Sequence, residues 1–182
     1  MTFPWPFSIW GIGIIGQINP KANNRHHYIL VTIGYFSKWV EAESYDVLIA
    51  RKVAQFIKQN IICCYGVPQE VISNNGPHFQ GEADEVLAEY GIKRHKSSPY
   101  WPQINGAFEA ANKNLKNILS KMVEIGKDWH LKLPFALWGY RTTERVSMKT
   151  SPFSLVYATE AALPIEIEVS SLRVHFKSPV LE

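Results

Sequence analysis

Hydrophobic residues near the start of the chain occur in short runs that are typical of strands. Runs rich in β-branched residues at 8–15 and 28–33 predict two buried strands. The polar stretch between them, residues 17–25, contains Pro20 and a pair of asparagines, which favours a hairpin loop. Residues 38–44 predict a third strand, more exposed than the first two.

Helical spacing follows, and then strands and helices alternate. Apolar positions recur at helical intervals over residues 48–65, with Asp46 upstream as a candidate cap. Residues 70–73 predict a brief strand that ends in the Asn-Asn-Gly turn at 74–76. A second helix, ending at Gly91, comes after this turn.

The remaining elements complete an α/β pattern with a mixed sheet. Residues 92–96 predict a short basic strand, and a long helix is expected at 107–125. A further helix begins after Asp128, which can cap it. We expect one domain over residues 1–160 and a tail over 161–182, which is either a loosely packed terminus or an extended arm that joins a neighbour's sheet.

Composition excludes several classes of protein. The hydrophobic content of 46% and charged content of 19% are typical of a soluble globular protein, and the formal net charge of +3 permits a polyanionic partner without requiring one. No apolar run is long enough to span a bilayer, so we expect no membrane association and an intracellular protein. Cys63 and Cys64 are adjacent, as are His26 and His27, and neither pair predicts a disulfide framework or a zinc site.

Several blocks of the sequence resemble the integrase catalytic core of gypsy-type plant LTR retrotransposons, over about residues 5–170. They are Pro6-Phe-Ser-Ile-Trp-Gly-Ile-Gly-Ile-Ile-Gly16, Tyr35-Phe-Ser-Lys-Trp-Val-Glu-Ala42, Tyr65-Gly-Val-Pro68, Asn75-Gly76, Ser98-Pro-Tyr-Trp-Pro-Gln-Ile-Asn-Gly106, Glu109-Ala-Ala-Asn-Lys-Asn114, Leu133-Pro-Phe-Ala-Leu-Trp-Gly-Tyr-Arg-Thr-Thr143 and Thr150-Ser-Pro-Phe-Ser-Leu-Val-Tyr157.

The resemblance implies a ribonuclease-H-like fold, a five-stranded mixed sheet flanked by helices. It also implies polynucleotidyl transfer, in which the 3′ hydroxyls of the retroelement ends attack target DNA. Such chemistry uses two divalent metals, Mg²⁺ or Mn²⁺, held by two aspartates and a glutamate. The partners implied are DNA and a second copy of the chain in a homodimer, the location is the nucleus, and no small-molecule substrate is expected.

Two of the three metal-ligand positions depart from the family. The first aspartate is replaced by Gly13, which has no side-chain ligand, and the second by Asn74, whose amide is uncharged. Only Glu109 keeps a carboxylate, and its spacing from Asn74 is one residue shorter than usual. A further aspartate expected before Tyr35 is Gly34. We therefore predict weak or absent metal binding and little strand transfer.

Basic side chains supply the candidate DNA contacts. Lys113 and Lys116 follow Glu109 on one face of the long helix, where the resemblance implies contact with the DNA end. The alternative is a solvated face with a Glu109–Lys113 ion pair. A second basic patch consists of Lys93, Arg94 and Lys96, which instead could protect an edge strand. Glu82, Asp84 and Glu85 are interpreted as a solvated helix face rather than replacement metal ligands.

The leading hypothesis is an integrase catalytic-core-like protein with DNA integration and nucleic-acid binding by descent and an impaired active site. A non-catalytic DNA-binding or oligomerisation module of the same fold is the alternative. A hydrolase of the ribonuclease H type is a third hypothesis, and it needs the same missing carboxylates.

Overall fold

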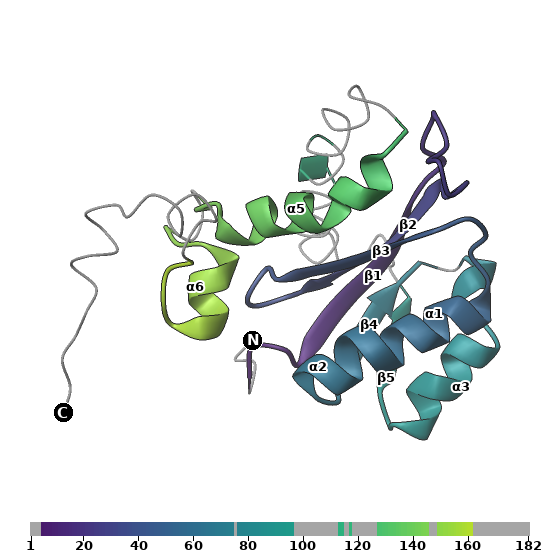
Figure 1. Cartoon of the computed structure of the whole chain (residues 1–182). Helices are drawn as coiled ribbons and strands as arrows, with labels where there is room; N and C mark the ends of the chain where they lie inside the picture. The colour runs from purple at the N-terminus through teal and green to yellow at the C-terminus, as the bar shows by residue number, and fades with distance from the viewer. Residues whose placement is uncertain are drawn as a thin grey trace.

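Five strands form one mixed sheet in the computed structural model, which describes residues 5–74, 76–96, 113, 114, 117, 127–145 and 149–161 (Figure 1). Their order across the sheet is β3-β2-β1-β4-β5. β1 pairs antiparallel with β2 and parallel with β4, while β5 continues the parallel side. The strands are β1 (Ile9–Gly16), β2 (Tyr28–Gly34), β3 (Val40–Tyr45), β4 (Glu70–Ser73) and β5 (Lys93–Lys96).

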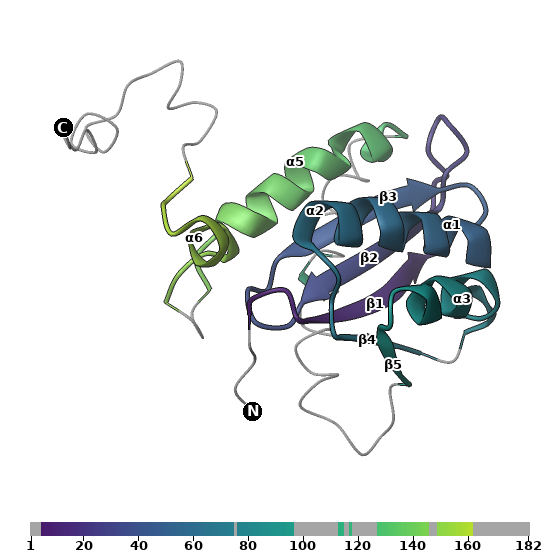
Figure 2. The same ribbon diagram turned by 90° about the horizontal axis from the view of Figure 1, so that it is seen from below.

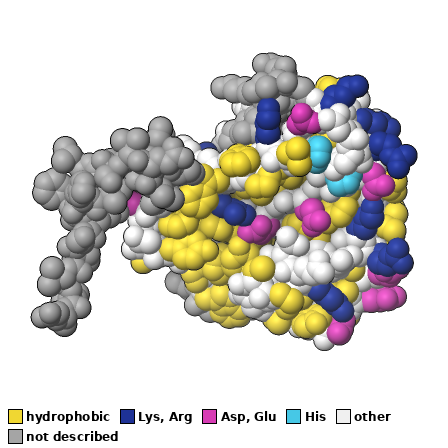
Figure 3. All heavy atoms as spheres, in the orientation of Figure 1, with side chains coloured by type: hydrophobic (Ala, Val, Ile, Leu, Met, Phe, Trp, Pro, Cys, Tyr) yellow, Lys and Arg dark blue, Asp and Glu magenta, His cyan; other side chains and the backbone are white. Residues whose placement is uncertain are grey.

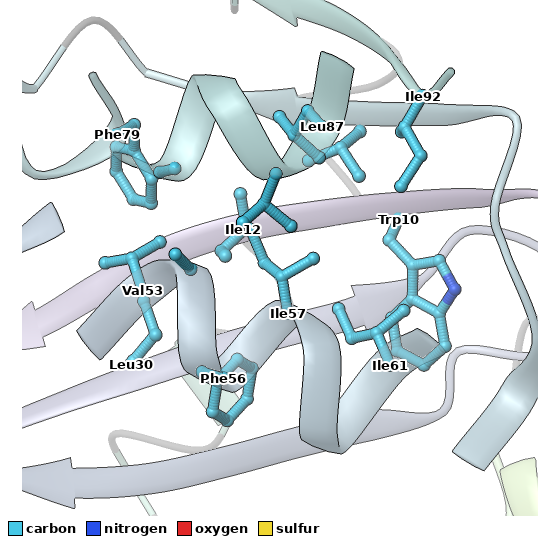
Figure 4. Packing of buried hydrophobic residues seen from close by; sticks show 14 of the residues in the cluster. Trp10, Ile12, Leu30, Val53, Phe56, Ile57, Ile61, Phe79, Leu87 and Ile92 are labelled. Carbon is cyan, nitrogen blue, oxygen red and sulfur yellow. The ribbon is translucent and has the colours of Figure 1, made fainter. Parts of the chain in front are cut away.

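The first face of the sheet is covered by the helices that connect its strands (Figures 1 and 2). Trp10, Ile12 and Leu30 project from the central strands into a core formed with these helices (Figure 4). The side chains that meet them, including Phe56, Ile61 and Leu87, are almost entirely buried. The helices are α1 (Ala50–Phe56), the π-helical segment η1 (Ile57–Ile62), α2 (Cys63–Tyr65), the short 3-10 turn η2 (Pro77–Phe79) and α3 (Glu82–Glu89).

The opposite face carries α5 (Trp129–Thr142), which is followed by α6 (Pro152–Tyr157) (Figure 1). Trp129 and Leu133 of α5 pack against Ile15, Ile29 and other residues of the central strands in a second core. Strand side chains alternate between faces, so each central strand contributes to both cores. This explains why β1 and β2 are apolar throughout rather than alternating with polar residues.

The α/β class is confirmed, as is the predicted order of the elements from β1 to β5 within the described residues, and β3 and β5 are the sheet edges. Two capping predictions are wrong. The first helix begins at Ala50 without a side-chain cap, because Asp46 instead accepts hydrogen bonds from Val47 N and Lys52. Asp128 is the residue before α5, but its carboxylate accepts a hydrogen bond from Asn23 rather than capping the helix.

The helix α6 was not anticipated from the sequence. Ser151 precedes it and accepts a hydrogen bond from Ser154 N at 3.1 Å, and Pro152 occupies the first turn. A serine followed by a proline is a recognised helix start, so the signal was present. Most of the long helix expected at 107–125 lies outside the described residues, as does the tail after Ala161. Within the described chain, no helix is both long and apolar enough to cross a membrane.

Candidate active site

The fold brings two of the three predicted metal-ligand positions together. The parallel register pairs Gly11 with Ile72 and Ile12 with Ser73, so the next residues along β1 and β4, Gly13 and Asn74, are neighbours. Adjacent strands lie about 4.8 Å apart, a distance at which two carboxylates could share a metal ion. The two predicted positions are therefore neighbours in the sheet, and neither supplies a carboxylate.

Gly13 lies in the middle of the sheet and its backbone is buried. Its partner on the other side is Val31 of β2, a member of the second core. Because Ile12 projects into the first core, a side chain at position 13 would point to the opposite face of the sheet, on which α5 lies. Residues 13 and 74 open onto the same face, since directly paired positions share a face.

Asn74 is exposed at the carboxyl end of β4, where its side chain makes the turn that follows. Its Oδ1 accepts a hydrogen bond from Gly76 N at 3.0 Å. This is the Asx-type turn that asparagine and aspartate commonly form. One of the two lone pairs of this amide oxygen is thus used by the backbone, and the oxygen carries no charge.

Arg94 of β5 holds this turn in place from the other face of the sheet. Its guanidinium donates to Asn74 O at 3.2 Å, to Phe79 O at 2.5 Å and to Ser73 Oγ at 3.0 Å. It also forms an ion pair with Asp84 of α3 at 2.5 Å, and only 11% of the Arg94 side chain is exposed. Arg94 therefore joins β4, η2 and α3 around the Asn74 position.

These contacts change the interpretation of two predicted residues. Arg94 was expected to contact DNA as part of a basic patch, but its hydrogen-bonding capacity is directed inside the chain. Asp84 was interpreted as part of a solvated helix face, whereas it is the counter-ion of Arg94. Arginine suits this bridging position better than lysine because its planar guanidinium has several donors. The partners of Arg94 are distant from it along the chain, so the sequence did not identify them.

The other residues predicted to contact DNA are not part of the hydrogen-bonded cluster around Arg94. Lys93 and Lys96 are exposed on β5, on either side of Arg94. Lys113 is exposed and helical. Glu109 and Lys116 lie outside the described residues. The proposed roles of these residues in metal and DNA binding thus remain predictions.

The described residues at this site do not fit a pair of divalent cations. Hard cations such as Mg²⁺ require several oxygen ligands, usually carboxylates. Gly13 and Asn74 supply no negative charge, and no cluster of three or more His, Cys, Asp or Glu side chains suited to a metal occurs among the residues that the structure describes.

A partly buried ionic network at the β3 edge of the sheet was also missed from the sequence. Glu41 of β3 accepts hydrogen bonds from Tyr65 OH at 2.5 Å and Trp39 Nε1 at 2.9 Å, and it pairs with Arg141 of α5 at 2.7 Å. Burial raises the pKa of Tyr65, and its hydrogen bond to Glu41 raises it further. This network links α2, β3 and α5 at the β3 edge of the sheet, and two strands separate β3 from β4 and the Asn74 position.

Comparison with known proteins identifies sequence relatives among retroviral polyproteins. The chain is 36% identical over 135 residues to the Gag-Pol polyprotein of feline leukemia virus, covering 72% of this chain and 8% of the polyprotein. It is 32% identical over 155 residues to the Gag-Pol polyprotein of avian reticuloendotheliosis virus, covering 84% and 13%. The chain thus spans a small part of these relatives. No protein-family model matches it.

Solved structures with the same fold include two integrase catalytic core domains and a viral intasome. The catalytic core domain of BIV integrase has a TM-score of 0.67 and 24% identity, covering 84% of this chain and 94% of that one. The HTLV-2 integrase catalytic core domain, solved in complex with magnesium, has a TM-score of 0.67 and 19% identity, covering 84% and 97%. A simian T-cell lymphotropic virus intasome gives a TM-score of 0.71 and 21% identity, covering 87% and 59%. The chain is a relative of retroviral Gag-Pol polyproteins and has the ribonuclease-H-like fold of a retroviral-type integrase catalytic core.

Proposed function

We propose that this chain is the integrase core of a gypsy-type plant retrotransposon whose metal-dependent chemistry is impaired and whose affinity for DNA is retained. The observation that carries the proposal is the adjacency of Gly13 and Asn74 in the parallel β1–β4 pair. The fold sets these two positions side by side, where the relatives' chemistry requires anionic ligands, and both residues are uncharged. Glu109 is the one carboxylate left from the three, and it would face two divalent cations alone.

The energetic consequence is large even for one missing ligand. Losing a group that stabilises charge in the transition state by about 3 kcal/mol lowers the rate roughly 10²-fold. Arg94 does not compensate, because a cation beside the Asn74 backbone adds positive charge where the metals need negative charge. The chain's own contribution is then confined to binding and orienting DNA with exposed lysines such as Lys93, Lys96 and Lys113.

The test restores the carboxylates in the full chain. The Gly13→Asp/Asn74→Asp double variant is expected to bind Mg²⁺ more tightly by calorimetry and to gain at least about 10²-fold in strand transfer with Mg²⁺ or Mn²⁺. Adding Glu109→Gln to that double variant should abolish both gains, which ties them to a shared metal site. Strand transfer by the unchanged chain at the rate of the double variant would contradict the impairment.

A second function on the same fold is a DNA-binding or oligomerisation module without catalysis. The same exposed lysines favour it, because phosphate contacts do not depend on metal ligands. Binding to duplex DNA that weakens steeply with salt, together with no gain of activity in the double variant, would favour this alternative. The proposal further includes a homodimer, to be measured by sedimentation, and a nuclear location, to be measured with a tagged chain in plant cells.

A further inference from the structure

The corner of the molecule formed by the β1–β2 hairpin and the start of α5 carries basic side chains, and none of the DNA contacts predicted from the sequence lies there. Lys21 and Arg25 are exposed in the hairpin loop, and Lys127 is exposed just before α5. Figure 3 shows lysine, arginine and histidine side chains gathered over this corner. We call the three residues Lys21, Arg25 and Lys127 the hairpin shoulder.

The hairpin shoulder is held together by contacts between segments distant in sequence. Asn23 N donates to Lys127 O at 3.0 Å, and its side-chain amide donates to Asp128. Trp129 is fully buried and donates from Nε1 to the carbonyl of Pro20 at 3.2 Å. Because these bonds attach the loop to α5, its positive charges are displayed on a fixed surface instead of a free loop.

The hairpin itself is further ordered by its own side chains. The ring of Tyr28 covers Gly16, where a β-carbon would collide with it. The His27 ring lies 4.3 Å from the Tyr28 ring. Arg25 adopts a positive φ of 66°, and its N–H donates to Ala22 O at 2.8 Å. Such a backbone conformation persists only where surrounding contacts maintain it.

The positive charges of the hairpin shoulder are not neutralised within the described residues. None of its three members forms an ion pair there. Of the nearby acids, Asp46 is paired with Lys52, whereas Asp128 accepts a hydrogen bond from the neutral Asn23 amide and keeps its negative charge beside Lys127. Three cations and one carboxylate leave this corner with a net positive charge. Three cationic side chains that form no ion pair among the described residues therefore lie at one corner, where they attract an anionic partner.

Histidines extend the surface toward the sheet without adding permanent charge. His26 lies beside His130 of α5, with ring centroids 6.4 Å apart, and its Nδ1 is 2.8 Å from Ser44 Oγ. Burial holds the pKa of His26 below its ordinary value. Near neutral pH this imidazole is therefore a polar neighbour, and the attraction to an anion comes from the lysines and the arginine.

The position of the hairpin shoulder relative to the site identifies the partner. Three residues of β1 separate Gly13 from Gly16, the last residue of the strand, and the hairpin loop follows directly. At roughly 3.3 Å per residue, the loop begins about 10 Å beyond Gly13. β4 is parallel to β1 and ends at Ser73, so the Gly13 and Asn74 positions lie toward the same end of the sheet as the loop. Duplex DNA carries about one charge per 1.7 Å along its axis, so a duplex bound across these positions would bring phosphates to the loop.

We infer that the hairpin shoulder binds the phosphate backbone of duplex DNA as a second contact surface, additional to the lysines of β5 and of the segment around Lys113. The inference rests on the proposed DNA-binding function. Contacts of this kind do not read base sequence, but they fix the direction in which a duplex leaves the site. They are also independent of the missing metal ligands.

The experiment compares three double variants of the full chain that remove the same number of charges. Lys21→Gln/Arg25→Gln alters the hairpin shoulder, and Lys93→Gln/Lys96→Gln alters β5. The control is Arg51→Gln/Lys149→Gln, two exposed cations that form no ion pair among the described residues. Binding of a short fluorescent duplex is measured by anisotropy at several salt concentrations, and circular dichroism verifies folding. Each lost phosphate contact reduces the slope of log affinity against log salt by about 0.9.

The hairpin variant is expected to lower this slope by about 1 to 2, while the control variant leaves it unchanged. A hairpin variant that behaves as the control, while the β5 variant loses slope, would overturn this inference and leave the proposed function standing. Absence of salt-dependent binding by the unchanged chain would overturn both. A competition experiment tests the choice of partner. If polyglutamate displaces the labelled duplex as well as unlabelled duplex of the same charge does, the surface binds any polyanion, and duplex DNA as its specific partner is overturned.

Discussion

At the scale of single residues, Arg94 shows that a basic residue in a basic segment can have a structural role. Lys93, Arg94, His95 and Lys96 are consecutive and look equivalent in the sequence. In the fold, Arg94 bonds to Asp84 and Ser73, whereas Lys93, which strand alternation turns to the other face, and Lys96, the last residue of the strand, remain exposed. The role of Arg94 depends on partners in β4, η2 and α3. The sequence pattern alone does not show that these segments meet at Arg94.

We predict that Arg94→Ala lowers the free energy of unfolding by about 2–3 kcal/mol, because several acceptors lose their donor and Asp84 loses its counter-ion. The partial exposure of Asp84, at 46% of its side chain, keeps the effect below that of a fully buried pair. Urea unfolding measures the change. Lys93→Ala is the matched control and should change stability by less than about 0.5 kcal/mol. Equal effects of the two substitutions would contradict this role.

At the scale of elements, the contact of α5 with the edge strand β3 depends on Arg141. Its guanidinium donates to Val40 O at 3.0 and 2.8 Å and lies 4.4 Å from the Trp39 ring. Together with the Glu41 ion pair, these contacts occupy the start of an edge strand that would otherwise expose backbone acceptors. The network thus joins a helix to the sheet by polar contacts as well as by the second core.

We expect Arg141→Met to lower the free energy of unfolding by about 3 kcal/mol, because Glu41, with 15% of its side chain exposed, loses its counter-charge. In the Arg141→Met/Glu41→Gln double variant the loss should be smaller than the sum of the two single losses, since no unpaired charge is left. Chemical denaturation of the four proteins in this cycle provides the measurement. Strict additivity would show that the pair contributes no coupling.

The boundaries of elements show which local signals are sufficient. The strands β1 and β2 were predicted closely because continuous apolar runs admit few alternatives. The helix caps were predicted wrongly at Asp46 and Asp128, because both carboxylates found side-chain or backbone partners elsewhere. The sequence shows that a side chain is able to cap a helix, but the tertiary surroundings decide which hydrogen bond that side chain makes.

At the scale of the whole molecule, the division of the chain into a domain at 1–160 and a tail at 161–182 remains a prediction. If it is right, a chain that ends after Ala161 keeps every described element, since α6 ends at Tyr157. Its melting temperature should then differ from that of the full chain by no more than about 2 °C, corresponding to less than about 1 kcal/mol. Calorimetry of both chains tests this, and a larger decrease would place the tail within the cooperative unit.

The sequence alone determined the α/β class, the order of the elements from β1 to β5 and the absence of carboxylates at Gly13 and Asn74, because hydrophobic periodicity and residue chemistry are local properties. Tertiary structure decided that these two positions are neighbours, through the register of β1 and β4. It also decided that Arg94 is bonded within the chain and that Lys21, Arg25 and Lys127 share one surface. The physical reason is that register and docking bring together residues separated by long stretches of chain, and no local pattern encodes those distances.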